Sequence, residues 1–586
     1  MKIIIDLQGL QIAGNRERGI GRYSLEITRA LIHYYPENEY ILFTNSALMD
    51  LRSDFHYELN NPKFKLIYFE CPTLGDVNES YVGIYSNLWS STKLRSYALS
   101  IINADIILIT SFFDGFRDNS LVSHDNSFRL PPIVSIIYDL IPLIHTENYL
   151  NDDPEYKLFY LNKIKELENL DGLLAISQSS LREASKYLKI KPEFIYNISS
   201  ACNKKIFSLR NSNSNLDRQY LGRFLFYCGA TDPRKNLSRL IEAYASLPLH
   251  LICKHKLVLT GPIKDEEISL IKEWMITFGL PPEYVVFLGF VSDTELANLY
   301  RSCHLLIFPS LHEGFGLPVL EAMNCGAPVI ASNVTSMPEI IGDNKFLFDP
   351  LNAKDLSSMI YKSLTDNQFY KSICSNSIER VKYFSWENTS RRTIEALKKI
   401  IDRVSTSIRK TEIDYIASRN SEYNKLINSF SKSPIIKSIN KSKYVYLQCL
   451  ASAISIINDQ LNKLDLIRQV KYNKILTWNI EGPFDTSYSL AILNRNYALA
   501  MENLGQNVSL YSTDGLGDYS PNPEFLQENK IVMDLYNRSK KRQESSFICT
   551  RNLYPPRVKD VNGVINLLHA YGWEESEFPN EWVDEF

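Results

Sequence analysis

The stretch Ser310–Ala322 reads SLHEGFGLPVLEA, and its spacing decides the fold that the sequence predicts. It follows the apolar run His304–Pro309, which is typical of a buried parallel strand. Two glycines inside the stretch allow a tight turn, and a proline suits the first turn of a helix expected over Val319–Asn324. A strand, a glycine-rich turn and a helix predict an α/β fold, in which ligands bind beyond the carboxyl ends of the strands.

Two glutamates, Glu313 and Glu321, flank this turn. Free N–H groups and the helix dipole favour an anion at the start of the helix. An ionised carboxylate accepts hydrogen bonds and does not donate them, so it suits hydroxyl groups. A phosphate flanked by hydroxyls indicates a sugar nucleotide, with Glu321, placed in the first helical turn, at the ribose diol and Glu313 at the donor sugar. The alternative is that both glutamates are solvated and that the glycines only turn the chain.

A second stretch of related chemistry lies upstream, over Phe224–Leu247 (FLFYCGATDPRKNLSRLIEAYASL). We expect a strand over Phe224–Cys228, a turn at Gly229, and Arg234 and Lys235 in the first turn of the next helix. Cations in a first helical turn oppose the helix dipole unless an anion joins them. The two cations are therefore well placed to stabilise a departing diphosphate, although a solvated basic turn is the alternative.

Together these stretches resemble the retaining glycosyltransferases of family 4. That family has a glycine turn followed by Arg-x-Lys or Arg-Lys, and its E-x7-E element matches Glu313–Glu321, including the Gly-Phe-Gly-Leu-Pro between the glutamates. The resemblance covers roughly residues 1–400. It implies a GT-B fold, which is an α/β fold of two Rossmann-like lobes facing a cleft, here followed by a helical linker and an incomplete third Rossmann-like lobe.

The resemblance also implies a division into domains. Residues 1–210 would form the N-terminal, acceptor-side lobe, completed by a returning helix at about 383–400 with Trp386 as its packing anchor. Residues 211–382 would form the nucleotide-sugar-binding lobe. We expect a helical linker over residues 401–470 and part of the first lobe of a second glycosyltransferase unit over residues 471–586.

The first lobe contributes its own candidate residues. Gly19 and Gly21 resemble the family's first glycine loop, which with Arg22 would cover the diphosphate from the opposite side. Asp139 matches the acidic residue that ends a buried strand in the family, with a turn cap as the alternative. Tyr138 stands where many relatives have a histidine, which leaves a histidine role open, and His145 is expected to be a loop residue rather than a replacement.

The resemblance assigns the site residues to two groups. It implies catalytic roles for Arg234, Lys235, Glu313 and Asp139. The donor-binding residues that it implies are Gly19, Gly21, Arg22, Gly229, Val291, Gly314, Phe315, Gly316, Leu317 and Glu321. We expect no metal ligands and no cofactor, because the nucleotide diphosphate sugar is a substrate. With no protein nucleophile evident, the departing phosphate would take the acceptor proton during same-face attack.

The preferred donor and acceptor follow from the opening DLQGLQ…RGIGRYS and the tandem layout. Both resemble bacterial mannosyltransferases of surface-polysaccharide (O-antigen) assembly. GDP-mannose is therefore the preferred donor, and an oligosaccharide or lipid-linked glycan is the expected acceptor. The alternatives are a UDP- or dTDP-sugar donor, or a scaffold that recruits a partner polysaccharide enzyme. A sugar phosphorylase is disfavoured, because no lysine in the setting of a pyridoxal cofactor is evident.

The composition limits the classes of partner that the chain is expected to bind and the compartment in which it is expected to lie. The chain has 586 residues and a net charge of −3, which argues against a general nucleic-acid binder. Its nine cysteines are dispersed, without metal-ligand spacing, which favours a reducing compartment. The sequence shows no signal peptide and no apolar run of membrane-spanning length. We expect a cytoplasmic protein, with peripheral contact at the inner face of the membrane or with a polysaccharide-assembly partner as a further expectation.

The C-terminal part differs in character. Residues 401–470 mix apolar and basic residues and could dock on another subunit or an anionic membrane, or act as a spacer. A new Rossmann-like start follows, with strands expected over Lys474–Asn479 and Val508–Tyr511, a glycine loop at Gly482, and His569 in the cleft. Because no second diphosphate site or E-x7-E element follows, we expect no independent transferase there.

Overall fold

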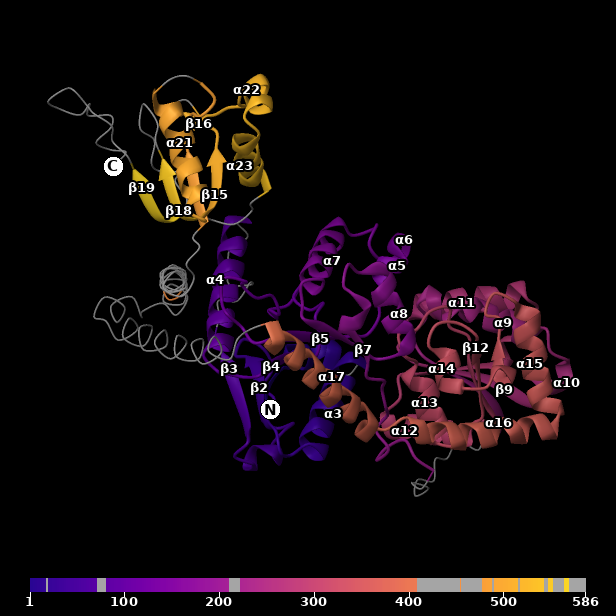
Figure 1. Cartoon of the computed structure of the whole chain (residues 1–586). Helices are drawn as coiled ribbons and strands as arrows, with labels where there is room; N and C mark the ends of the chain where they lie inside the picture. Colours follow the sequence, from indigo (N-terminus) through magenta and orange to yellow (C-terminus); the bar gives the residue numbers. More distant parts are fainter. Residues whose placement is uncertain are drawn as a thin grey trace. The chain divides into compact units, whose positions relative to one another are not determined.

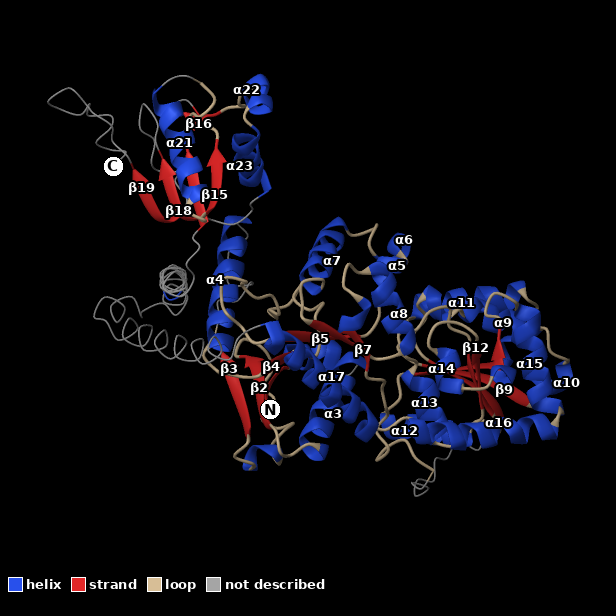
Figure 2. Cartoon of the chain, in the orientation of Figure 1, coloured by secondary structure: helices blue, strands red, loops and turns tan. Residues whose placement is uncertain are grey.

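The computed structural model describes residues 1–16, 19–70, 81–209, 222–407, 450, 454, 477–486, 489–514, 517–541, 546–551 and 563–568. These residues belong to two compact units, 1–454 and 455–586. Figure 1 colours both units along the sequence, and Figure 2 shows their strands and helices. Within the described residues, no helix combines the length and the apolar character that crossing a membrane requires.

The first lobe is built on a seven-stranded parallel sheet in the order β3-β2-β1-β4-β5-β6-β7. Its central strands are apolar runs rich in isoleucine and fully buried, as expected for strands covered on both faces. The strands are β1 (Lys2–Asp6), β2 (Glu39–Asn45), β3 (Phe64–Phe69), β4 (Ile106–Ile109), β5 (Ile133–Ile137), β6 (Gly172–Ala175) and β7 (Ile195–Asn197). The helices are α1 (Gln8–Gln11), α2 (Ala13–Arg16), α3 (Gly19–Tyr34), α4 (Tyr81–Ser100), α5 (Ile141–Ile144), α6 (Thr146–Tyr149), α7 (Pro154–Leu167) and α8 (Gln178–Tyr187).

The second lobe is built on a six-stranded parallel sheet in the order β10-β9-β8-β11-β12-β13. Helices cover both faces of this sheet (Figure 2). The strands are β8 (Arg223–Cys228), β9 (His255–Thr260), β10 (Val285–Gly289), β11 (Leu305–Phe308), β12 (Val329–Ser332) and β13 (Leu347–Phe348). The helices are α9 (Leu237–Ala245), α10 (Leu249–Ile252), α11 (Asp265–Thr277), α12 (Asp293–Ser302), α13 (Leu317–Asn324), α14 (Met337–Ile341), α15 (Ala353–Thr365), α16 (Asn367–Arg380) and α17 (Trp386–Ser407).

After the second lobe, helix α17 returns to the first lobe and packs against α3. The Trp386 and Tyr23 rings meet edge to face, with centroids 5.3 Å apart. Ile400 is buried, and a Cβ added to Gly172 would lie 2.6 Å from its Cδ1 atom. A side chain at position 172 would therefore displace the end of the Ile400 side chain, which packs α17 against β6.

The two parallel sheets confirm the predicted α/β architecture of paired Rossmann-like lobes, and two local predictions are wrong. Gly19 and Gly21 lie in the first turn of α3 and not in a loop. The helix after the glycine turn begins at Leu317 and not at Val319, because Gly316 takes the N-cap position.

The second unit contains a four-stranded parallel sheet in the order β15-β14-β18-β19. Its strands and helices are β14 (Thr477–Glu481), α21 (Ser489–Asn503), β15 (Asn507–Tyr511), the hairpin β16 (Thr513–Asp514) and β17 (Gly517–Asp518), α22 (Pro523–Glu528), α23 (Lys530–Lys541), β18 (Ser546–Arg551) and β19 (Gly563–Leu568). This sheet confirms the predicted partial third Rossmann-like lobe. Most of the predicted linker, which is residues 408–449, 451–453 and 455–470, lies outside the described residues, as does His569.

Candidate active site

The basic turn after β8 is held in a different conformation from the one predicted. Arg234 and Lys235 lie in a short 3-10 turn, Pro233–Lys235, whose cap is the Asp232 carboxylate accepting from Arg234 N at 3.0 Å. Asn236 then adopts a left-handed conformation with φ 60°, and α9 begins only at Leu237. Both cations therefore occupy a single turn of 3-10 helix that Asp232 caps, and the α-helix begins only after them. Because this 3-10 turn precedes α9, neither cation is inside the first turn of that helix.

The turn is fastened to the loop that carries Glu313. Leu311 N donates to Arg234 O at 2.7 Å, and the Asn236 amide donates to Pro309 O at 3.1 Å. Because that loop follows β11, the neighbour of β8 in the sheet, the ends of two adjacent parallel strands bring the predicted residues together. The strand order thus places the basic turn and the E-x7-E loop side by side.

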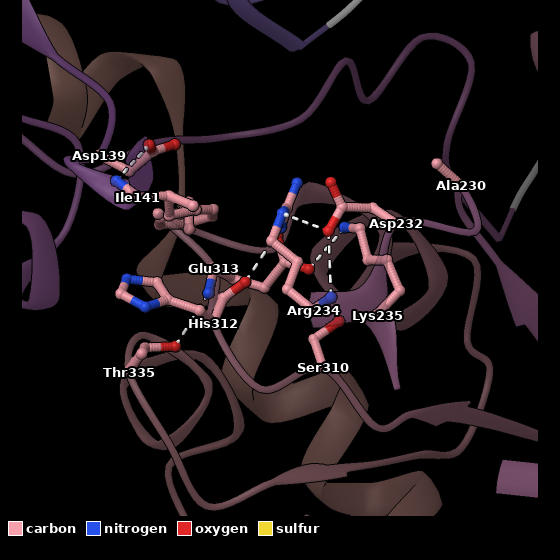
Figure 3. Close-up of polar contacts among 12 residues, drawn as sticks. Asp139, Ile141, Ala230, Asp232, Arg234, Lys235, Ser310, His312, Glu313 and Thr335 are labelled. Atoms are coloured by element: carbon pink, nitrogen blue, oxygen red, sulfur yellow. Dashed lines mark hydrogen bonds and ion pairs between the residues drawn. The ribbon is translucent and has the colours of Figure 1, made fainter. Parts of the chain in front are cut away.

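Glu313 lies between the two cations (Figure 3). Its Oε1 atom is 2.5 Å from Lys235 Nζ, and its Oε2 atom is 3.0 Å from Arg234 Nη1. Burial alone would raise the pKa of Glu313, but the charges of Lys235 and Arg234 outweigh burial and lower it below its ordinary value. Asp232 Oδ1 also lies 3.6 Å from Arg234 Nε, so two carboxylates face the two cations.

The glycine turn lies directly against the first lobe. A Cβ added to Gly314 would come within 2.4 Å of Tyr138 O, so no side chain fits there. Gly314 O accepts hydrogen bonds from Ser177 Oγ at 2.6 Å and Ser180 Oγ at 3.1 Å. Gly316 has a φ of 107°, a conformation that a side chain would strain, and it lets α13 begin immediately after the turn. Both predicted glycines are therefore required by the backbone.

A chain of polar side chains reaches this turn from the first lobe, and the sequence did not reveal it. His145 Nε2 lies 3.1 Å from His312 Nδ1, and His312 Nε2 lies 3.1 Å from Glu183 Oε1. His312 directly precedes Glu313 in the sequence. This position could have indicated that His312 belongs to the site. His145 follows α5, as a loop residue should, yet its imidazole contacts the residue beside the proposed catalytic centre.

Asp139 follows β5 at the edge of the sheet that faces Gly314. Its Oδ1 atom accepts a hydrogen bond at 3.1 Å from Ile141 N, in the first residue of α5 (Figure 3). Burial raises its pKa, against the lowering effects of that hydrogen bond and of the Arg234 charge. Tyr138 donates its hydroxyl to Thr110 O at 2.9 Å. The alternative in which Asp139 caps a turn accounts for the contact of one of its two carboxylate oxygens.

Glu321 lies away from this cluster, on a cavity of about 240 Å³. It occupies the second turn of α13, not the first as predicted, because the helix begins at Leu317. Tyr300 OH lies 3.4 Å from Glu321 Oε2. Burial raises the pKa of Glu321 to about 7, with Arg22 acting in the opposite direction. Burial disfavours the ionised form of Glu321, and hydroxyl groups of a ligand that donate to its carboxylate would favour that form.

The cavity is lined from both lobes. Arg22 of α3, predicted to cover a diphosphate, donates instead to Asp293 Oδ1 at 2.7 Å across the lobes. The full lining is Arg22, Tyr23, Leu25, Glu26, Arg29, Ala201, Cys202, Asn203, Ile206, Phe207, Asp293, Leu317, Glu321 and Trp386. The sequence singled out Arg22, Leu317 and Glu321 as donor-binding residues, and it missed Glu26, Asn203 and Asp293.

The other predicted donor-binding residues lie in turns or at the ends of elements, and some have buried side chains. Phe315 is buried, and its ring meets Phe384 edge to face at 5.8 Å, so only its backbone can face a ligand. Gly229 directly follows β8, and a Cβ on the adjacent Gly261 would lie 2.0 Å from Gly229 O. Val291 follows β10 and is half-buried. A Cβ added to Gly19 would lie 3.8 Å from Leu317 Cδ1.

Comparison with known proteins identifies the second lobe. Residues 216–380 match the family model described as "Glycosyl transferases group 1", so this part of the chain is a domain of that family. A sucrose-phosphate synthase from Thermosynechococcus elongatus superposes with a TM-score of 0.51 at 18% identity, over 69% of this chain and 100% of that one. This likeness supports the fold of paired Rossmann-like lobes.

Two curated relatives extend the comparison to the first unit. Serotype-specific mannosyltransferase WbdA of Escherichia coli is 33% identical over 411 residues, which are 68% of this chain and 48% of that protein. O-antigen chain mannosyltransferase B of Escherichia coli is 28% identical over 390 residues, which are 65% of this chain and 96% of that protein. The chain thus spans about half the length of the first of these relatives.

Proposed function

We propose that the first unit is a retaining glycosyltransferase that moves a hexose from a nucleotide diphosphate sugar to a hydroxyl of a growing bacterial surface glycan. The observation that carries this proposal is the placement of Arg234 and Lys235 around Glu313 at the carboxyl ends of β8 and β11. Mannose from GDP-mannose is the preferred donor, because both curated relatives are mannosyltransferases.

In this proposal the cations bind the diphosphate and the carboxylates bind hydroxyl groups of the donor. Arg234 and Lys235 bind the leaving diphosphate, where preorganised cations in a poorly hydrated site stabilise charge as it develops. Glu313 is held as a carboxylate by the same cations, so it can accept hydrogen bonds from hydroxyls of the donor sugar. Glu321 binds the ribose diol from the second turn of α13. The group transfer needs no metal and no cofactor in this proposal.

The bond changes balance without a protein nucleophile. The acceptor oxygen forms a bond to the anomeric carbon on the face from which the diphosphate departs, and the bond from that carbon to the phosphate oxygen breaks. The departing phosphate takes the proton of the acceptor hydroxyl. Asp139 lies on the first-lobe side of the glycine turn, where it would orient the acceptor.

The site must reorganise to admit its ligand. In the structure, Glu313 neutralises part of the positive charge that a diphosphate needs, and Gly314 is hydrogen-bonded to Ser177 and Ser180. We infer that the donor enters by separating the two lobes at this contact, so that the diphosphate can share the cations with Glu313. A cytoplasmic location, a lipid-linked acceptor and peripheral contact with the membrane or with an assembly partner belong to the same proposal.

Binding of nucleotides to the purified chain tests the proposal directly. We expect one of GDP, UDP, ADP and dTDP to raise the unfolding temperature, with GDP giving the largest shift. Transfer from GDP-mannose to an oligosaccharide acceptor should then follow, with the anomeric configuration retained. A chain that binds none of these nucleotides would instead fit the alternative function, a scaffold that recruits another polysaccharide enzyme.

A further inference from the structure

A tyrosine of the first lobe reaches the basic turn of the second lobe. Tyr149 is the last residue of α6, and its OH group donates a hydrogen bond at 2.7 Å to Asp232 Oδ1. Asp232 is the residue that caps the 3-10 turn carrying Arg234 and Lys235. One carboxylate therefore joins the acceptor-side lobe to the two cations proposed for the leaving diphosphate.

Asp232 holds Arg234 at two of its atoms (Figure 3). Asp232 Oδ1 accepts from Arg234 N at 3.0 Å and lies 3.6 Å from Arg234 Nε. The same oxygen accepts the hydrogen bond from Tyr149. A hydroxyl group that donates to a carboxylate oxygen offsets part of its negative charge. The contact with Tyr149 therefore weakens the attraction between Asp232 and the guanidinium of Arg234.

This attraction matters because a diphosphate must compete for the cations. Glu313 pairs with both Arg234 and Lys235, and Asp232 is a second carboxylate beside Arg234. The side chain of Asp232 is 28% exposed, whereas that of Glu313 is 10% exposed. Asp232 is thus the more accessible of the two competing carboxylates, and it is the one that a side chain of the first lobe contacts.

The same segment of the first lobe reaches Arg234 from another side. His145 and Tyr149 lie at the two ends of α6, so this short helix fixes their spacing. His145 Nε2 lies 3.1 Å from His312 Nδ1, and His312 O accepts from Arg234 Nη1 at 3.0 Å. Two of the residues that hold Arg234 are therefore each in contact with the first lobe.

The hydrogen bond between Tyr149 and Asp232 requires the lobes to be together, because each lobe supplies one partner. A sugar nucleotide that enters between separated lobes would bind before this hydrogen bond forms. Burial and the Asp232 carboxylate raise the pKa of Tyr149, against the lowering effect of Arg234, so the phenol keeps its proton near neutral pH. We therefore expect Tyr149 to affect the transfer step and not the initial binding.

We propose that Tyr149 is a positioning residue for the transfer step, which rests on the proposed function of Arg234 at the leaving diphosphate. When the lobes close, the Tyr149 hydroxyl offsets part of the charge of Asp232 and leaves the guanidinium of Arg234 available to the diphosphate. The acceptor-side lobe thereby completes the leaving-group site of the other lobe. Tyr149 acts through Asp232 and touches no reacting atom.

Kinetics and calorimetry on the full chain test this role with Tyr149→Phe, which removes only the phenol oxygen. With GDP-mannose and an oligosaccharide acceptor, kcat should fall by at least about tenfold, as expected for loss of one hydrogen bond to a charged group. The Kd of GDP should stay within about twofold of the wild-type value. Tyr57→Phe, at a tyrosine of the same lobe that is 76% exposed, should change neither quantity. If UDP, ADP or dTDP binds in place of GDP, the same measurements use that nucleotide and its sugar.

A double-mutant cycle tests whether Tyr149 acts through Asp232. In the Asp232→Ala background, Tyr149→Phe should lower kcat by less than about twofold, because the carboxylate that it contacts is gone. If Asp232→Ala does not fold, Asp232→Asn takes its place. The effect of Tyr149→Phe should again be smaller there than in the wild-type background, because the hydrogen-bond acceptor carries no charge.

The outcomes distinguish this role from a purely structural one and from the proposed function. A near-normal kcat of Tyr149→Phe, even with a lower unfolding temperature, would overturn the positioning role. An equal fall of kcat in both backgrounds, or a loss of GDP affinity as large as the fall in kcat, would overturn it as well. A wild-type chain that binds no nucleotide diphosphate and transfers no sugar would overturn the proposed function, and with it any role of Tyr149 in transfer.

Discussion

Lys235 Nζ lies 2.5 Å from Glu313 Oε1, and about nine-tenths of each side chain is shielded from solvent. Removing one partner of a buried charge pair leaves the other uncompensated, which costs more than the pair itself contributes. Arg234 contacts the other oxygen of the same carboxylate, so the three side chains act as one group. Changes at any of them should therefore affect both the charge of the site and the position of the others.

Lys235→Ala removes one of the two cations proposed for the leaving diphosphate. We expect turnover to fall by at least about a hundredfold, as loss of a preorganised charge contact typically does. Steady-state kinetics with saturating donor measures the effect. Lys371→Ala, an exposed change on α16, should be close to wild type. Near-normal turnover of Lys235→Ala would remove the basis for the diphosphate site.

Metal dependence is a separate test of the same cations. If Arg234 and Lys235 meet the charge of the leaving group, activity should survive dialysis against EDTA. The measurement is the transfer rate before and after chelation, with Mg²⁺ and Mn²⁺ added back in turn. Complete loss that either ion restores would show that a metal, and not the two side chains alone, carries the leaving-group charge.

The bounds of the first unit give a prediction about the tail. Ile400 is buried inside α17, which runs to Ser407, so a chain cut at residue 400 would lose part of a packed helix. A chain ending at Ile454 keeps the whole of the first compact unit. We expect it to transfer sugar to a small acceptor at a rate comparable to that of the full chain. A folded 1–454 chain without activity would show that the second unit takes part in the chemistry.

The structure brings several of the candidate residues together, but their local conformation differs from the prediction. Gly314 and Gly316 could be recognised because turns and close backbone approaches exclude side chains. The 3-10 turn at Arg234 could not, because it depends on Asn236, whose amide is held by Pro309 O and Pro350 O from distant loops. Propensity is local, and such tertiary hydrogen bonds override it.

Contacts between the lobes were the least accessible from the sequence. Arg22 pairs with Asp293 across 271 positions, and His312 with Glu183 across 129. Neither pair has a local pattern, since the two partners lie in segments far apart in the sequence. The fold was easier to predict, because buried parallel strands such as β1 and β11 appear as continuous apolar runs whose bounds need no partner to be recognised.

Stability should depend on pH through Glu321. Its pKa in the folded protein is raised to about 7, above the ordinary value of 4.5, by burial. A raised pKa means that its contribution to stability is full below about pH 4.5 and is lost as pH rises to about 7. Glu321→Gln carries no charge, so it should be more stable than the wild type above pH 7 by about 1–3 kcal/mol and should lose this advantage near pH 4.5. Urea unfolding without ligand at pH 5 and pH 8 measures the difference, and equal differences at both pH values would contradict it.

The same substitution should weaken the ligand that Glu321 is proposed to bind, and this separates its role from that of Glu313. Glu321→Gln turns an acceptor into a donor opposite a ribose hydroxyl, at a cost of about 1–3 kcal/mol, so affinity for the bare nucleotide should fall about ten- to a hundredfold. Glu313→Gln should barely change that affinity, because its proposed partner is the sugar, while turnover of the sugar nucleotide should collapse. Calorimetry with nucleotide alone distinguishes the two variants. Between pH 6 and pH 8, the affinity of the wild type for the nucleotide should also rise more steeply than that of Glu321→Gln. The Glu321 carboxylate must ionise to bind the ribose, whereas titration of the nucleotide affects both proteins equally. If both substitutions weaken the bare nucleotide equally, or neither does, the two glutamates do not divide the donor between ribose and sugar.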